Sequence, residues 1–105
     1  MITIVVLLTI RDAAAFEQFE RQAVAIMVEH GGKLDSAFRP SLPGNSQAAA
    51  VDEIHVLKFP NQESFERYKA DEQVAALASL REKAIAHTIV YVSAEEIDYS
   101  SLESH

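Results

Sequence analysis

The segment from Ile2 to Ile10, ITIVVLLTI, is the feature that most restricts how this chain can fold. It is rich in β-branched residues, which favour extended strands, and it is apolar on both alternating faces. Strands with two hydrophobic faces are normally covered on both sides. We therefore expect a central strand in a sheet whose two faces are both buried.

Composition limits the kinds of protein this chain can be. It has 105 residues, 49% of them hydrophobic, which fits a single domain with one core. The formal net charge is −7 and Lys and Arg form no cluster, which argues against nucleic acid or an anionic membrane as a partner. The absence of cysteine is compatible with a cytoplasmic protein, and the first apolar run is too short to span a bilayer.

The periodicity along the rest of the chain predicts the order βαββαβ. Asp12 is a suitable N-cap for a helix that continues to His30. Strands are expected over residues 33–39, 53–59 and 88–93, with a loop containing Pro and Gly over residues 40–52. Between the last two strands we expect a helix capped by Asn61 and a second helical segment from Asp71 to about Ala86.

This order is that of the ferredoxin-like α+β fold, a four-stranded antiparallel sheet in the order 4-1-3-2 with two helices on one face. The opposite face of the first strand, joined by residues such as Val90 or Val92, would be exposed in a monomer. A patch of several large aliphatic side chains exceeds what soluble monomers usually expose. We therefore expect a homodimer whose sheets pack face to face, formed by residues 1–94, followed by a polar tail over residues 95–105.

Two stretches, HGGKLDSAFRP and DEIHVLKFPNQESFERYKADEQVAALASLREKAI, resemble the small bacterial family called domain of unknown function 1330. The similarity runs from about His30 to Ala86, and its matching features are Gly31-Gly32, Phe59-Pro60, Ser64-Phe65 and Leu80-Arg81. The resemblance implies membership of the dimeric α/β-barrel superfamily and hence a homodimer. That superfamily also holds cofactor-free monooxygenases, muconolactone isomerases and haem-binding chlorite dismutase-like proteins, so the resemblance implies no single reaction.

His55 is the leading candidate for a catalytic residue. It stands between Ile54 and Val56 in an expected strand and shares its face with Glu53, two residues earlier. A carboxylate near an imidazole can fix its tautomer and raise its basicity, as a general base requires. The alternative is a histidine at the solvated end of the sheet whose ring only fills space.

Three further side chains are candidates for binding a ligand beside Glu53. Arg81 falls inside the apolar arc of the second helical segment, where a guanidinium needs a partner. That partner would be an anionic group of a ligand or an internal acid such as Glu53 or Asp52, unless the side chain reaches water. Tyr68 and Tyr91 either donate hydrogen bonds into a pocket between helices and sheet or belong to the core.

The sequence offers no histidine pair with metal-binding spacing, no Gly-rich phosphate loop and no GxSxG motif, so we expect no metal and no cofactor. The leading hypothesis is a cytoplasmic homodimer with a small pocket that performs acid/base or oxygen chemistry on a small organic acid or aromatic compound. The competing hypothesis is a non-catalytic dimer that binds a metabolite or partner, or a structural scaffold. The sequence leaves open whether the protein is an enzyme.

Overall fold

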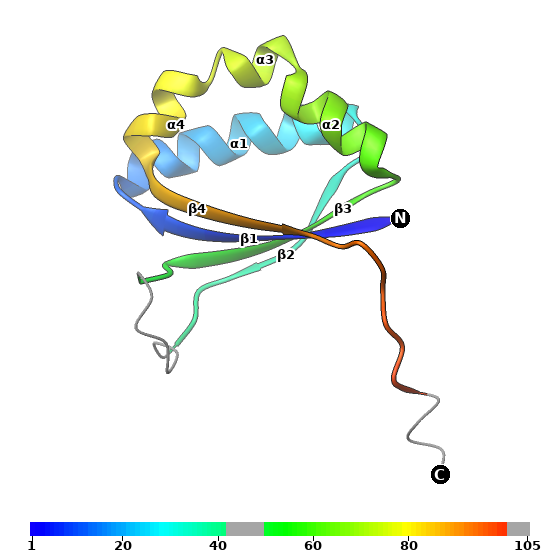
Figure 1. Ribbon diagram of the computed structural model, residues 1–105. Helices are drawn as coiled ribbons and strands as arrows, with labels where there is room; N and C mark the ends of the chain where they lie inside the picture. The colour runs from blue at the N-terminus through cyan, green and yellow to red at the C-terminus, as the bar shows by residue number, and fades with distance from the viewer. Residues whose placement is uncertain (42–49, 101–105) are drawn as a thin grey trace.

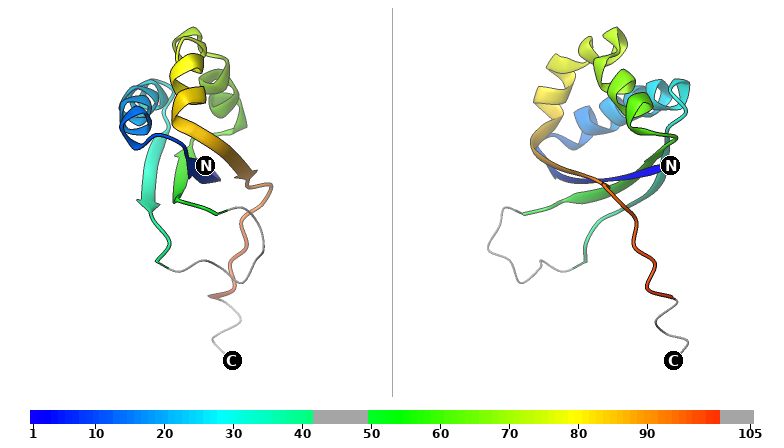
Figure 2. Two further views of the ribbon diagram at one scale, coloured as in Figure 1. Left: turned by 90° about the vertical axis from the view of Figure 1, so that its left-hand side faces the viewer. Right: turned by 45° about the vertical axis from the view of Figure 1, so that its right-hand side comes forward.

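The structure, a computed structural model, describes residues 1–41 and 50–100. Its elements are, in order, β1 (Ile2–Ile10), α1 (Ala13–Glu29), β2 (Lys33–Phe38), β3 (Glu53–Phe59), α2 (Gln62–Ala70), α3 (Glu72–Ala75), α4 (Ala78–Ala84) and β4 (Ile85–Val92). The strands form one antiparallel sheet in the order β2-β3-β1-β4, and the helices lie on one face of it (Figures 1 and 2). This is the expected ferredoxin-like α+β fold. Within the described ranges no helix is long and apolar enough to cross a membrane.

Side-chain caps determine where the helices begin. The Asp12 carboxylate accepts the backbone N–H of Ala15 at 3.0 Å, and the Asn61 side chain accepts that of Ser64 at 2.8 Å. Each cap satisfies a backbone donor that the first turn of a helix leaves free. Both helices therefore start where the sequence predicts.

The segment after α2 differs from the prediction in two ways. The expected second helix is divided into α3 and α4, and Leu77, which precedes α4, provides no side-chain cap. Ile85, which falls within the expected second helix, instead begins β4 and pairs with Ile10. A short apolar run fits a helix or a strand equally well, which explains the misplaced boundary. After β4 the chain leaves the sheet and extends away from it (Figure 1).

Pairing across the sheet decides which side chains face the helices. Ile4 and Leu8 are buried under the helices, and Val6, of the same parity, pairs with His55 in β3 and Val90 in β4. Directly opposed residues lie on the same face of a sheet. We call this helix-covered side the inner face and the other side the outer face. His55 therefore points toward the helices.

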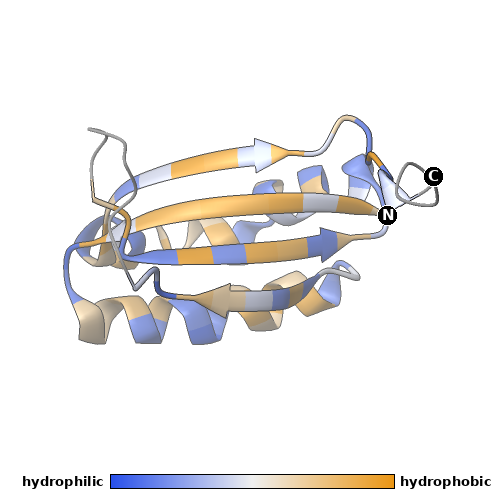
Figure 3. Ribbon diagram, turned by 90° about the horizontal axis from the view of Figure 1, so that it is seen from below, coloured by the Kyte–Doolittle hydropathy of each residue, from blue (hydrophilic) through white to orange (hydrophobic). Residues whose placement is uncertain are grey.

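In the described part of the chain no helix covers the outer face, which is seen from below in Figure 3. By the pairing register it carries Val5, Leu7, Phe38, Ile54, Val56, Ile89 and Tyr91. The expectation that Val90 and Val92 join this face is wrong, because they pair with inner-face residues of β1. Ile89 and Tyr91 occupy the outer positions of β4 instead, and Tyr91 is 61% exposed.

A bulge in β2 changes the face on which its side chains lie. The register with β3 shifts between Leu34 and Ser36. Leu34 pairs with the inner-face residue Leu57, whereas Phe38 pairs with Ile54 on the outer face. Simple alternation would have placed Leu34 and Phe38 on the same face of the sheet, and the extra residue of the bulge puts them on opposite faces.

Gly32 lets the end of α1 pack closely on β3. A Cβ atom at this position would lie 2.6 Å from the Phe59 ring and 2.7 Å from Cγ of Met27, well inside normal contact distance. Phe59 is completely buried, and its ring also packs against the rings of Phe65 and Tyr68. The ring therefore has little freedom to move away from an added methyl group.

The substitution Gly32→Ala is expected to lower the free energy of unfolding by about 1–3 kcal/mol, because Phe59 or the backbone must shift to accept the methyl group. Urea denaturation of the purified variant measures this. Val28→Ala, at an exposed position of α1, is the control and should change stability by less than about 0.5 kcal/mol. Unchanged stability of Gly32→Ala would contradict the close packing.

Candidate functional site

An inner cavity of ≈ 260 Å³ lies between the sheet and the helices. Most of its wall is apolar and includes Ile4, Val6, Phe19, Met27, Leu57 and Phe65. The side chains that add polar groups to the wall are Glu20, His55, Tyr68, Lys69, Arg81 and Thr88. An apolar cavity with a few polar groups is typical of small-molecule sites, and this volume is just below their usual range of roughly 300–1,000 Å³. The cavity therefore suits a small compound.

His55 is the most deeply buried polar residue of the site, with 4% of its surface exposed. Its Nε2 atom lies 2.6 Å from Oε1 of Glu53, which confirms the expected proximity of the two residues. An ionised carboxylate can only accept hydrogen bonds, so Nε2 is the donor, and in the neutral imidazole Nδ1 carries the lone pair. Phe16 of α1 packs against the ring at a centroid distance of 6.0 Å and limits its movement.

Glu20 of α1 brings a second carboxylate to the same imidazole. Its Oε2 atom lies 3.6 Å from Nδ1 of His55. Burial raises the pKa of the Glu20 carboxyl, the neighbouring His55 opposes this by lowering it, and Glu53 raises it further. Glu20 lines the inner cavity, whereas Glu53 does not. Glu53 instead lies behind His55 and pairs with Arg39 at 3.3 Å, so the three side chains form what we call the Glu20–His55–Glu53 row.

Tyr68 of α2 adds a phenol to the cavity wall. Burial and, to a smaller extent, the charge of Glu20 raise the pKa of Tyr68 to about 12, although the charge of Arg81 opposes this rise. At neutral pH the hydroxyl therefore keeps its proton and can donate a hydrogen bond. Because both charges act on the same phenol, Glu20 and Arg81 lie near it from two different helices.

Arg81 of α4 lines the cavity and donates a hydrogen bond from Nη2 to Oγ1 of Thr88 in β4 at 3.1 Å. The interpretation that it pairs with Glu53 or Asp52 is wrong, because Glu53 binds His55 and Arg39. Asp52 accepts a hydrogen bond from the backbone of β1. Among residues 1–41 and 50–100, Arg81 makes no ion pair.

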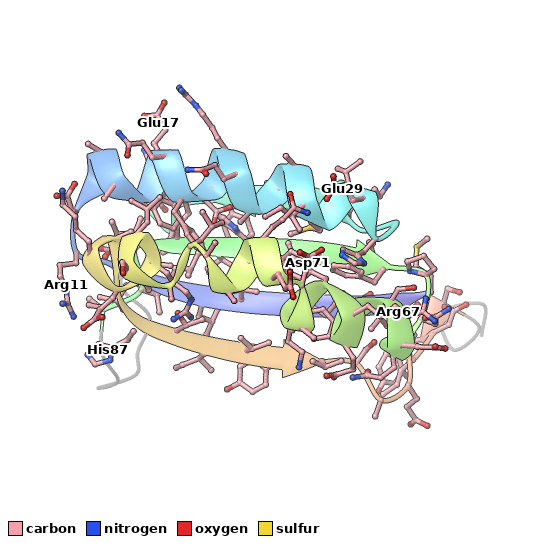
Figure 4. The ribbon with its side chains drawn as sticks, turned by 90° about the horizontal axis from the view of Figure 1, so that it is seen from above. Arg11, Glu17, Glu29, Arg67, Asp71 and His87 are labelled. Atoms are coloured by element: carbon pink, nitrogen blue, oxygen red, sulfur yellow. The ribbon has the colours of Figure 1, made fainter. Side chains whose placement is uncertain are left out.

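The other residues singled out in the sequence lie elsewhere. Tyr91 is on the outer face, so its interpretation as a donor into the cavity is wrong. His30 ends α1 and pairs through Nε2 at 2.8 Å with Asp71, which lies at the junction of α2 with α3 and is labelled in Figure 4. In the part of the chain that the structure describes, no three His, Cys, Asp or Glu side chains are arranged to hold a metal ion.

Glu20 is the site residue that the sequence analysis missed. It stands four residues after Phe16 and three before Ala23, so it falls inside the apolar arc of α1. A charged residue inside an apolar arc is the same signal that identified Arg81. The long hydrophobic pattern of this helix concealed the exception.

The fold and the cavity under its helices define a ferredoxin-like α+β protein. The chain belongs to the family called domain of unknown function 1330, whose sequence model matches residues 3–94. No curated protein matches the sequence.

Solved structures share this fold at low sequence identity. RPA0582, a protein of unknown function from Rhodopseudomonas palustris, has a TM-score of 0.78 and 14% identity over 92% of this chain and 83% of its own. A DABB family protein with a ferredoxin-like fold from Mesorhizobium loti has a TM-score of 0.65 and 16% identity, over 90% and 96% of the two chains. SnoaB, a cofactor-independent oxygenase from Streptomyces nogalater, has a TM-score of 0.62 and 16% identity, over 94% and 96%. A dimeric protein of ferredoxin-like fold is also among the neighbours.

The substitution Glu20→Gln is expected to stabilise the protein at neutral pH. Burial raises the pKa of Glu20 in the folded state, so its contribution to stability is fully present below about pH 4.5 and is lost as the pH rises through the folded-state pKa. Glutamine resembles the neutral acid, and we expect a gain on the order of 1 kcal/mol at neutral pH that shrinks toward acid pH.

Urea denaturation at neutral and at acid pH measures this difference. Glu17→Gln, on the exposed side of the same helix, is the matched control and should show no pH-dependent gain. A loss of stability for Glu20→Gln at neutral pH would contradict the inferred cost of burying this carboxylate.

Proposed function

We propose that this protein is a homodimer that binds a small organic acid or aromatic compound in the inner cavity and removes a proton from it with His55, without a cofactor. The Glu20–His55–Glu53 row at the wall of an apolar cavity carries this proposal. Burying two carboxylates beside an imidazole costs free energy that apolar side chains of similar size would avoid. Buried titratable groups gathered at a cavity, one of them with a raised pKa, are typical of acid/base sites.

In this proposal His55 acts as the general base through Nδ1. Glu53 accepts a hydrogen bond from Nε2–H, which fixes the tautomer of His55. The lone pair of Nδ1 then lies on the side of Glu20 and the cavity. As the substrate C–H or O–H bond breaks, an N–H bond forms at Nδ1 and the electron pair stays on the substrate as an anion. The resulting imidazolium lies between two carboxylates, which favour its positive charge.

Arg81 and Tyr68 would hold the anionic part of the substrate. A guanidinium binds a carboxylate with two parallel hydrogen bonds, and the phenol, protonated at neutral pH, donates to a developing negative charge. The substrate anion can be reprotonated at another atom, which is an isomerisation, or react with molecular oxygen. The fold shared with SnoaB, a cofactor-independent oxygenase, supports this general class of chemistry.

A thermal-shift screen of small aliphatic and aromatic carboxylic acids is expected to find compounds that stabilise the wild-type protein. A ligand present at 100 times its dissociation constant adds about 2.7 kcal/mol of stability. Arg81→Gln should abolish this stabilisation because it removes the cation that binds the acid. Arg67→Gln, on the exposed surface of α2, is the matched control and should respond as the wild type does.

The same screen separates binding from catalysis. His55→Asn should retain ligand stabilisation while losing turnover of any acid that the wild-type protein consumes. Retained turnover in His55→Asn would refute its role as the base. If no acid raises the melting temperature of the wild-type protein at any concentration, the ligand site is refuted.

The outer face supports the dimeric part of the proposal. Its apolar side chains come from all four strands, and β1 and β3 are the two central strands. Patches of this kind on soluble proteins mark interaction surfaces, and a second copy of the same sheet offers a matching face. The dimeric neighbour with this fold is consistent with such an arrangement.

Sedimentation equilibrium at micromolar concentration is expected to give the mass of a dimer. Ile89→Asp, which places a charge on the outer face, should shift the protein toward monomer while its circular dichroism stays native. Val28→Asp makes the same change at an exposed helix position and should remain dimeric. A stably folded wild-type monomer would overturn the proposal.

A further inference from the structure

We propose that His55 and Glu53 form a proton route that connects the inner cavity with a surface hollow on the other side of the imidazole. The hollow measures ≈ 370 Å³ and is lined by Ala37, Phe38, Arg39 and Glu53. The purpose of the route rests on the function proposed above, since it serves a base that works in the cavity. Its existence is a property of the protein alone and can be tested without a substrate.

The geometry places the two ends of the route on opposite sides of one ring. Glu20 lines the inner cavity and faces Nδ1 of His55 at 3.6 Å, while Glu53 lines the surface hollow and is hydrogen-bonded to Nε2 at 2.6 Å. The Glu53 side chain is 13% exposed and the His55 side chain 5%. The imidazole reaches water through Glu53 on one side and past Glu20, whose side chain is 23% exposed, on the other.

A bound substrate makes a second way to water necessary. It would fill the cavity on the Nδ1 side, where Glu20 otherwise gives access to water, and His55 itself is only 4% exposed. Glu53 projects from the inner face of the sheet together with His55, because both pair with inner-face residues of β1. Phe38, which also lines the hollow, lies on the outer face, whereas Glu53 lies on the inner face and away from a dimer formed through the outer one.

The proton transfer balances without any additional reactant. The proton that leaves the substrate forms an N–H bond at Nδ1, and the Nε2–H bond then breaks as an O–H bond forms on Oε1 of Glu53. Glu53 releases this proton to water in the surface hollow and becomes ionised again. The original tautomer of His55 returns when the Nδ1 proton moves to the product or to Glu20, while a proton re-enters from water through Glu53.

Charged and polar groups from the neighbouring elements surround the imidazole and its two carboxylates. Glu20 on α1 and Glu53 on β3 stabilise a positive charge on the ring, and Arg39, after β2, stabilises the ionised form of Glu53 at 3.3 Å. Arg81 on α4 and the protonated Tyr68 on α2 lie at the cavity wall. Burial raises the pKa of Glu20, whereas the ion pair with Arg39 favours the release of a proton from Glu53 to water.

The test is the rate at which the His55 ring N–H proton exchanges with water, measured by NMR on protein labelled with ¹⁵N-histidine. The His55 signal is assigned by its absence in His55→Asn. In Glu53→Gln the side chain keeps its size and can still accept a hydrogen bond, but it cannot accept a proton. Exchange should therefore slow by at least about tenfold, since a positioned acid–base group contributes roughly 10²–10⁴-fold to a proton transfer.

Three variants make the result specific. Arg39→Gln removes the ion pair at the surface hollow but keeps the carboxylate, so it should exchange like the wild type. Glu53→Asp retains a carboxylate and should restore most of the exchange lost in Glu53→Gln. Glu20→Gln alters only the cavity side and should leave exchange fast, which provides a test even where Glu53→Gln fails to fold.

Unchanged exchange in Glu53→Gln, or slowed exchange in Glu20→Gln, would overturn the proposal, because the proton would then leave through the cavity. Equal slowing in Arg39→Gln would also overturn it, since access to the hollow and not the carboxylate would control the rate. A failed ligand screen together with slow exchange in Glu53→Gln would refute the proposed function and leave the proton route in place.

Discussion

The burial of β1 is the constraint on which the rest of this structure depends. Its inner side chains Ile4 and Leu8 are covered by the helices, and its neighbours on both sides are strands, β3 and β4. This makes β1 and β3 the two central strands, and it holds His55 directly opposite Val6. A histidine on a central strand has backbone partners on both sides, so its position is fixed far more firmly than on a loop.

The core under the helices is divided into two groups, and the cavity lies where they meet. One group contains Leu8, Phe16 and Phe19, and the other contains Ile4, Met27 and Phe59. Val6 and Tyr68 pack against both groups and also line the cavity. A fold selected only for stability would close this gap with larger side chains, since each void forfeits dispersion contacts. The polar groups around the gap add a further cost of burial, which is the usual pattern at functional sites.

The sequence was sufficient to predict the fold and insufficient to assemble the site. The two-sided pattern of Ile2–Ile10, the caps at Asp12 and Asn61, and the alternation of Glu53 with His55 are local signals, and the structure agrees with each. The register of β4 was misjudged, because Ile89–Val92 is apolar at every position and alternation gives no direction. The position of Arg81 in an apolar arc marked it as unusual, but the sequence did not identify its partner. Its hydrogen bond with Thr88 depends on the path of the chain from α4 into β4.

The Glu20–His55–Glu53 row shows why such a site escapes local pattern analysis. The strand period of two places Glu53 beside His55, while the helix period of 3.6 places Glu20 above it, and only the packing of α1 on β3 unites them. The two carboxylates are therefore not equivalent, although both contact the same ring. Glu53 stands at the start of β3 and lines the surface hollow. Glu20, on the helix, lines the apolar inner cavity. Burial raises the pKa of Glu20, whereas Glu53 is paired with Arg39, so the two sides of the ring differ in their electrostatic surroundings.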